Sequence, residues 1–115
     1  MTLKLLSGYE TLEYEIAQEK ASALGRLGRR LEGALAALAA CSRMVHSDQK
    51  MRDRLAAEAG YALWLFVIQR EACGLRDSAQ IMRDYGVPRE VYNRMGPLSA
   101  PGNLSDEDQV VTSIG

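Results

Sequence analysis

Residues 9–40 carry the longest helical pattern of hydrophobic and polar positions in the chain. The stretch contains no proline and is rich in Ala, Leu, Glu and Arg, which are strong helix formers. At 100° per residue, six apolar side chains fall on one face: Ile16, Leu24, Leu27, Leu31, Leu35 and Leu38. Ser7 or Gly8 stands where a capping residue is favoured. The pattern predicts one long amphipathic helix.

Three glycines within this pattern leave an alternative open. A glycine in a helix interior costs about 1 kcal/mol relative to alanine, so the helix could instead break at Gly25, Gly28 or Gly33. A continuous helix would be about 48 Å long, whereas a compact body of this size is roughly 32 Å across. Its overhanging end would then need a partner, either the second helix or another copy of the chain.

A second helix is predicted from residue 47 to about residue 73. Ser47 is its expected N-cap, because apolar residues follow it at helical spacing. Residues 59–68 are apolar on all sides, which is typical of a helix that is buried on all sides. Gly74 is predicted to end the helix as its C′ residue, with Leu75 packing back against it.

The C-terminal third of the chain is predicted to contain two shorter helices. The first covers residues 77–85 and ends at Gly86, and the second starts at Pro88, which is favourable at the first helical position, and ends at Gly96. Residues 97–115 contain two prolines and an acidic triplet, so we expect an irregular or disordered acidic tail.

These elements predict an all-α fold. Residues 1–96 form a single helical domain, with two long antiparallel helices and a short C-terminal helical hairpin. The length of the first helix and the all-round apolar run of the second exceed what one small body can cover. We therefore expect a homodimer, arranged as a dimeric helical bundle.

Four charged residues on the first helix form a candidate interface. Glu15, Glu19, Arg26 and Arg30 share one face within about 60°, and the acidic pair precedes the basic pair. An antiparallel copy crossing near residues 22 and 23 would place Glu19 opposite Arg26 and Glu15 opposite Arg30. The alternative is a solvated stripe that complements the helix dipole, and the same crossing would also bring two further acidic residues together.

The aromatic residues of the second helix complete the candidate interface. Trp64 is the only tryptophan and lies among large apolar residues, including Phe66. We expect Trp64 to lie in the core or at the subunit interface, and we include both residues in the interface hypothesis.

Composition narrows the classes of function. Lys and Arg number 14 and Asp and Glu 15, for a net charge of −1, which excludes a polybasic nucleic-acid coat.

Cys41 and Cys73 lie in apolar helical runs without CxxC or CxxH spacing, so we expect core thiols in the cytoplasm. The longest apolar run, residues 59–68, is about half of the roughly 20 residues that span a bilayer, so no membrane partner is expected.

Residues 79–95 resemble a helix-turn-helix, with Gly86 in the turn. The resemblance departs from the common pattern at two packing positions, where Met82 replaces a small alanine and Tyr92 replaces a small aliphatic residue. The second helix offers only Arg89, Asn93 and Arg94 to a polyphosphate partner. We therefore expect no nucleic-acid partner, and a small DNA-binding regulator is the alternative interpretation of function.

Sequence motifs for catalysis are missing. His46 is the only histidine and lies in a predicted loop, five residues after Cys41, and this spacing alone does not establish a catalytic dyad. The sequence has no HExxH, GxGxxG or GK[ST] motif and no paired-cysteine metal spacing. We predict no catalytic residue, cofactor or metal. The expected function is that of a non-enzymatic helical module for oligomerisation or protein interaction.

Two segments carry a resemblance to a known family. The sequences ALGRLGRRLEGAL and GLRDSAQIMRDYGVPREVYNRMG, after a Glu-rich opening, resemble a small family of uncharacterised bacterial all-α proteins. The resemblance covers most of residues 9–96. It implies a helical domain of unknown function and carries no activity, cofactor or catalytic residue.

Overall fold

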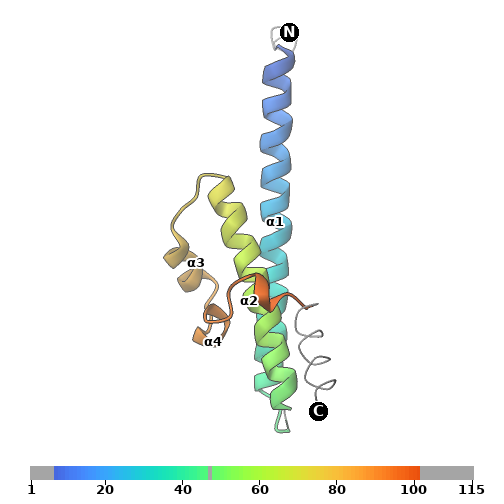
Figure 1. Cartoon of the computed structure of the whole chain (residues 1–115), viewed down its shortest axis with the longest axis vertical. Helices are drawn as coiled ribbons and strands as arrows, with labels where there is room; N and C mark the ends of the chain where they lie inside the picture. Colours follow the sequence, from blue (N-terminus) through green and yellow to red (C-terminus); the bar gives the residue numbers. More distant parts are fainter. Residues whose placement is uncertain (1–6, 47, 102–115) are drawn as a thin grey trace.

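The structure, a computed structural model, describes residues 7–46 and 48–101, and all its regular elements within these ranges are helical. In chain order these are α1 (Gly8–Ser42), α2 (Gln49–Ala72), α3 (Ser78–Asp84), α4 (Arg89–Tyr92) and the short 3-10 helix η2 (Pro97–Ser99). α1 and α2 pack side by side in opposite directions, and α3 and α4 form a small hairpin beside α2 (Figure 1). The all-α prediction with two long helices and a hairpin is confirmed.

α1 is continuous over 35 residues, or about 52 Å. Ser7 caps its start: the hydroxyl accepts from the Glu10 N–H at 3.1 Å, and the Glu10 carboxylate accepts from the Ser7 N–H at 3.4 Å. The helix passes through all three interior glycines without a break, so the prediction of a continuous helix is confirmed.

α2 starts and ends at well-formed caps. Asp48, rather than the predicted Ser47, is the N-cap, and its carboxylate accepts from the Lys50 N–H at 3.1 Å. Ser47 itself lies outside the described residues. At the other end Gly74 has φ +85°, and the Leu75 N–H donates to the Arg70 carbonyl at 2.8 Å, which is a Schellman cap. Gly74 is thus the predicted C′ residue, although Leu75 remains 44% exposed.

The core lies where α2 covers the C-terminal half of α1. Leu31 and Leu63 are fully buried there, and the hairpin adds Ile81 and Val91, which are 2% and 0% exposed. The hairpin reaches α2 at Gly60, where an added Cβ would lie 2.6 Å from the Arg94 carbonyl oxygen. Only glycine permits this close approach of two backbones.

The hairpin turns at a second Schellman cap. Gly86 has φ +59°, and the Val87 N–H donates to the Met82 carbonyl at 3.0 Å. The helix that follows differs from the prediction: Pro88 is its N-cap rather than its first residue, and α4 ends at Tyr92 rather than near Gly96. The following residues make tighter i→i−3 hydrogen bonds, as the Arg94 carbonyl comes to rest against α2.

The first residues after Gly96 are also ordered against the body. η2 packs on α2, and the Ser99 hydroxyl donates to the Arg94 carbonyl at 2.6 Å. The prediction of an irregular tail from residue 97 is therefore wrong for η2. The remaining part of the tail, residues 102–115, lies outside the described residues.

The N-terminal half of α1 extends beyond the rest of the fold, as the upper part of Figure 1 shows. The Gln69 amide donates to the Lys20 carbonyl at 3.2 Å, and this contact marks the end of the region that α2 covers. The radius of gyration is 18.7 Å, compared with about 13 Å for a compact chain of this length. The overhang expected from the length of the helix is present.

Candidate interaction surface

The projecting part of α1, residues 8–22, is exposed at every position. Leu12 and Ile16 are 54% and 47% exposed, and Tyr9 is 71% exposed. At 100° per residue Tyr9 and Ile16 lie on the same side of α1 as Leu27, which packs on the core farther along the helix. The apolar face of α1 therefore continues for about 18 Å beyond Lys20, where the cover by α2 ends.

The four charged residues of the interface hypothesis lie on the surface of α1. Arg26 and Glu19 form an ion pair within the helix at 3.2 Å, with 58% and 74% of their side chains exposed. The Arg30 guanidinium lies 5.3 Å from the centre of the Tyr61 ring on α2. The Glu15 side chain is exposed. All four side chains remain accessible from outside.

Two interior glycines of α1 have opposite surroundings. An added Cβ at Gly28 would lie 3.3 Å from the Phe66 ring and 3.4 Å from the Tyr85 hydroxyl, so this glycine makes room for α2 and the hairpin. An added Cβ at Gly33 would meet nothing within 4 Å. Packing in the described chain thus accounts for Gly28 but not for Gly33, although both weaken the helix relative to alanine.

Gly33 and the charged residues lie on the side of α1 that is turned away from the hairpin. At 100° per residue, Gly28 is separated from the Glu15, Glu19, Arg26 and Arg30 face by about 180°. Since Gly28 packs against the Tyr85 hydroxyl of the hairpin, the charged face points in the opposite direction. In the described chain this face is exposed, and only Arg30 at its edge contacts α2, through the Tyr61 ring.

Trp64 and Phe66, the two aromatic residues of the interface hypothesis, differ in how deeply they are buried. Phe66 is 4% exposed and packs edge-on against Tyr85 with ring centres 5.4 Å apart. It belongs to the core of one chain, which removes it from the candidate interface. Trp64 is only partly buried, next to Tyr61 with ring centres 5.9 Å apart. Together with Ile68, which is 44% exposed, it shows that the apolar run of α2 is not covered on all sides.

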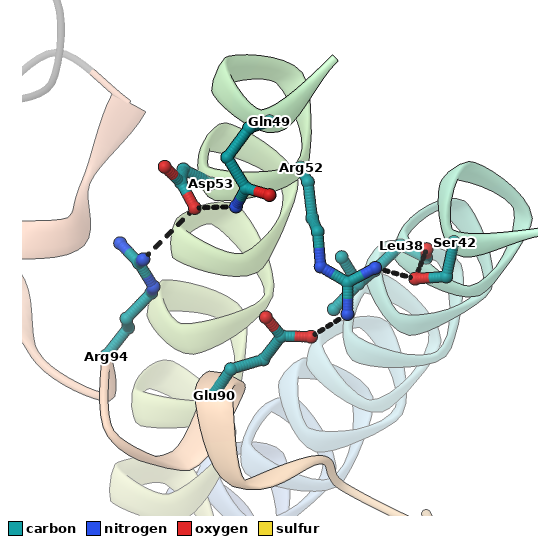
Figure 2. A network of polar contacts seen from close by, with 7 residues as sticks. All are labelled: Leu38, Ser42, Gln49, Arg52, Asp53, Glu90 and Arg94. Atoms are coloured by element: carbon teal, nitrogen blue, oxygen red, sulfur yellow. Dashed lines mark hydrogen bonds and ion pairs between the residues drawn. The ribbon is translucent and has the colours of Figure 1, made fainter. Parts of the chain in front are cut away.

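A polar network holds the hairpin against the two long helices (Figure 2). The Arg52 guanidinium on α2 bridges the Glu90 carboxylate, at 2.8 Å, and the Ser42 hydroxyl at the end of α1. Asp53 accepts from Arg94 at 3.5 Å and from Gln49 at 2.8 Å. A cavity of about 410 Å³ lies beside this network, and the same Ser42, Arg52 and Glu90 supply charged and polar groups to its lining.

The network also bears on the helix-turn-helix resemblance. α4 is four residues long, one turn, and its Glu90 side chain is engaged by Arg52. Val91 in the same turn is fully buried, and Arg94 just after it faces Asp53. Arg89 and Asn93 remain exposed beside a shallow hollow that Tyr92 also lines. The basic residues named for DNA contact therefore do not share one exposed helix face.

The two residues considered for a catalytic dyad differ in their exposure. Cys41 is 7% exposed on the apolar face of α1, whereas His46 is exposed in the loop between α1 and α2. Among the described residues there is no group of three or more His, Cys, Asp or Glu side chains suited to a metal ion. None of the described helices is long and apolar enough to cross a membrane.

Sequence reasoning missed two of these features. The Arg52–Glu90 contact joins residues 38 positions apart, and no local pattern could reveal it. The close approach at Gly60 had a signal, a single glycine inside an apolar helical run, which often marks a backbone contact. Both features fix the hairpin, and neither lies on the open face of α1.

Comparison with known proteins places the chain in a family. The model of a family of unknown function, DUF6665, matches residues 3–103. This match includes both long helices, the hairpin and η2. No curated protein and no solved structure matches the chain. The chain belongs to the DUF6665 family, a family of unknown function.

Proposed function

We propose that this protein is a non-enzymatic helical interaction module whose first partner is a second copy of itself. The observation that carries the proposal is the projecting segment of α1, where residues 8–22 are all exposed although Leu12 and Ile16 are apolar. An apolar helix face that extends beyond the body of a protein is typical of a surface that another helix covers.

The projecting segment lacks the tertiary contacts that normally stabilise a helix, and this supports the proposal. An isolated helix of fewer than about 12–15 residues is marginal in water, and the projecting segment, although it continues the packed part of α1, buries no apolar face in the described chain. The capping box at Ser7 and Glu10 contributes locally, but helix caps are worth only about 1 kcal/mol. Burial of Leu12 and Ile16 against a partner helix would supply the tertiary contacts that the segment lacks in a single chain.

The alternative uses of the chain have less support. Ser42, Arg52 and Glu90, the polar groups beside the cavity, already bind one another and hold the hairpin. DNA binding through residues 79–95 would rest on the one-turn α4. The two free cysteines, of which Cys41 is buried, favour a reducing compartment such as the cytoplasm.

The proposal is tested by adding charge to the projecting segment of the full chain. Leu12→Glu with Ile16→Glu is expected to lower the mass from dimer to monomer in light scattering at micromolar concentration, because a charge at Leu12 would be buried in the contact and a second charge would lie beside it, about 40° around the helix. Tyr14→Glu is the matched control: Tyr14 is 64% exposed and lies about 160° from Ile16 around the helix. It should leave the dimer intact.

Circular dichroism separates loss of association from loss of folding in these variants. All three positions are exposed, so the helix content of the body should be retained. A wild-type chain that stays monomeric across the micromolar range would contradict the proposal. A Leu12→Glu, Ile16→Glu chain that remains as dimeric as wild type would contradict the role of the projecting segment.

A further inference from the structure

The open face of α1 is a continuous stripe of exposed residues along the helix. Between residues 12 and 37, eight positions of α1 fall within about 80° of arc at 100° per residue, and every one is exposed. We call them the pairing face: Leu12, Glu15, Glu19, Ser22, Arg26, Arg30, Gly33 and Ala37. The face runs from the projecting segment onto the part of α1 that carries α2 on its other side.

Building on the proposed self-association, we infer that two copies pair antiparallel along this face, crossing between Ser22 and Ala23, with Leu12 of each copy seated on Gly33 of the other. In this register position n of one copy lies opposite position 45 − n of the second. Leu12 then faces Gly33, and the projecting segment of each copy lies along the covered half of the other.

Charge complementarity supports this register. The order acidic, acidic, basic, basic along the face is self-complementary only when the two helices are antiparallel. Glu15 then faces Arg30 of the second copy, and Glu19 faces Arg26. The Glu19–Arg26 ion pair within each helix is highly exposed, so both side chains can join a four-charge cluster about the crossing point. Opposed charges of this kind fix register and orientation between helices.

The small residues supply the matching shape. Gly33 has open space where a Cβ would be, and Ala37, one turn farther along, is exposed. A large side chain of a second helix can enter such a site, because small residues allow helix axes to approach closely. Leu12, at 54% exposed, is the large apolar side chain that the antiparallel register brings there. The pairing thus gives Gly33 the packing partner that the single chain lacks.

Other registers use less of the face. A shorter overlap centred between residues 16 and 17 would place Glu13 opposite Lys20, but it leaves Gly33 and Arg30 without a counterpart. In the register with Leu12 on Gly33, Glu13 falls level with Glu32 of the second copy. Both residues lie about 120° or more from the centre of the pairing face, so they point away from the contact and do not oppose the pairing.

Two charge-reversed full-length chains test the register directly. The first carries Glu15→Arg and Glu19→Arg, so its pairing face is wholly basic; the second carries Arg26→Glu and Arg30→Glu, so its face is wholly acidic. Each alone should associate more weakly than wild type by about ten-fold or more, because like charges meet across the crossing. Mixed in equal amounts, they should form a dimer with one copy of each, which native mass spectrometry identifies.

A cross-linking experiment locates the crossing independently of charge. Ser22→Cys, next to the crossing point, should give a disulfide-linked dimer under mild oxidation. Ala21→Cys, about 140° from the centre of the pairing face, is the matched control and should not cross-link above the background set by the two native thiols. Circular dichroism of all variants checks folding, which exposed positions should preserve.

The outcomes separate this inference from the proposed function. A wild-type chain that is monomeric would overturn both. A dimeric wild type, with charge-reversed chains that each still dimerise and with no Ser22→Cys cross-link, would overturn the register while self-association stands. Binding of another protein by a monomeric chain would mean that the face serves a different partner, and this too would overturn the pairing.

Discussion

At the scale of single residues, the glycines distinguish internal packing from open surface. Gly60 is required because the backbone of Arg94 occupies the space where its Cβ would be. An added Cβ at Gly25, by contrast, would meet only the end of the flexible Arg29 side chain, at 3.4 Å. The same substitution should therefore have opposite effects at these two positions of similar helical conformation.

Replacement by alanine tests this distinction. Gly25→Ala should raise the free energy of unfolding by about 0.5–1 kcal/mol, because alanine favours the helix. Gly60→Ala should lower it by about 1–3 kcal/mol, since the Arg94 segment must move away from α2. Urea denaturation measures both changes. A Gly60→Ala chain as stable as wild type would show that the hairpin and α2 do not approach as closely as described.

At the scale of elements, the hairpin is held by long-range contacts rather than by its own helices. α3 and α4 span seven and four residues, too few to be stable helices in isolation. Their buried side chains, Ile81 and Val91, provide the apolar contacts. The Arg52–Glu90 ion pair, with 32% and 34% of its side chains exposed, fixes where α4 lies on the long helices.

A double-mutant cycle measures what this ion pair contributes. Arg52→Ala and Glu90→Ala should show a coupling free energy of about 0.5–1 kcal/mol in thermal or urea unfolding. Asp53→Ala with Arg94→Ala is the comparison, and its coupling should be smaller, because that pair is longer at 3.5 Å and more exposed. Equal couplings for the two pairs would argue against a special role of Arg52 and Glu90 in positioning α4.

The elements also mark what local sequence can and cannot predict. The helical spacing of apolar residues and the capping residues were enough to place α1, α2 and α3, since both signals act within a few residues of the chain. Ser47 and Asp48 are both good capping residues, so their order could not be decided from sequence. The length of α4 depends on the contact of Arg94 with Gly60, and the exposure of Trp64 depends on which side of α2 the hairpin covers. Such contacts join distant parts of the chain and leave no periodic signal.

At the scale of the whole molecule, the single chain leaves one long helix half covered. The longest dimension is 66 Å, and the projecting part of α1 presents apolar side chains to solvent. Every residue of the pairing face is exposed, and its charges and small residues complement those of an antiparallel second copy. The shape of the chain and the pattern on α1 therefore lead to the same expectation, a dimer assembled along α1.

The mass of the unmodified full-length chain in solution tests this expectation most directly. Sedimentation equilibrium over the micromolar range, at moderate salt so that the charge pairs on α1 persist, measures it without a label or a substitution. The account predicts a mass twice the 12.7 kDa of one chain. A mass that stays at 12.7 kDa over the whole range would contradict it.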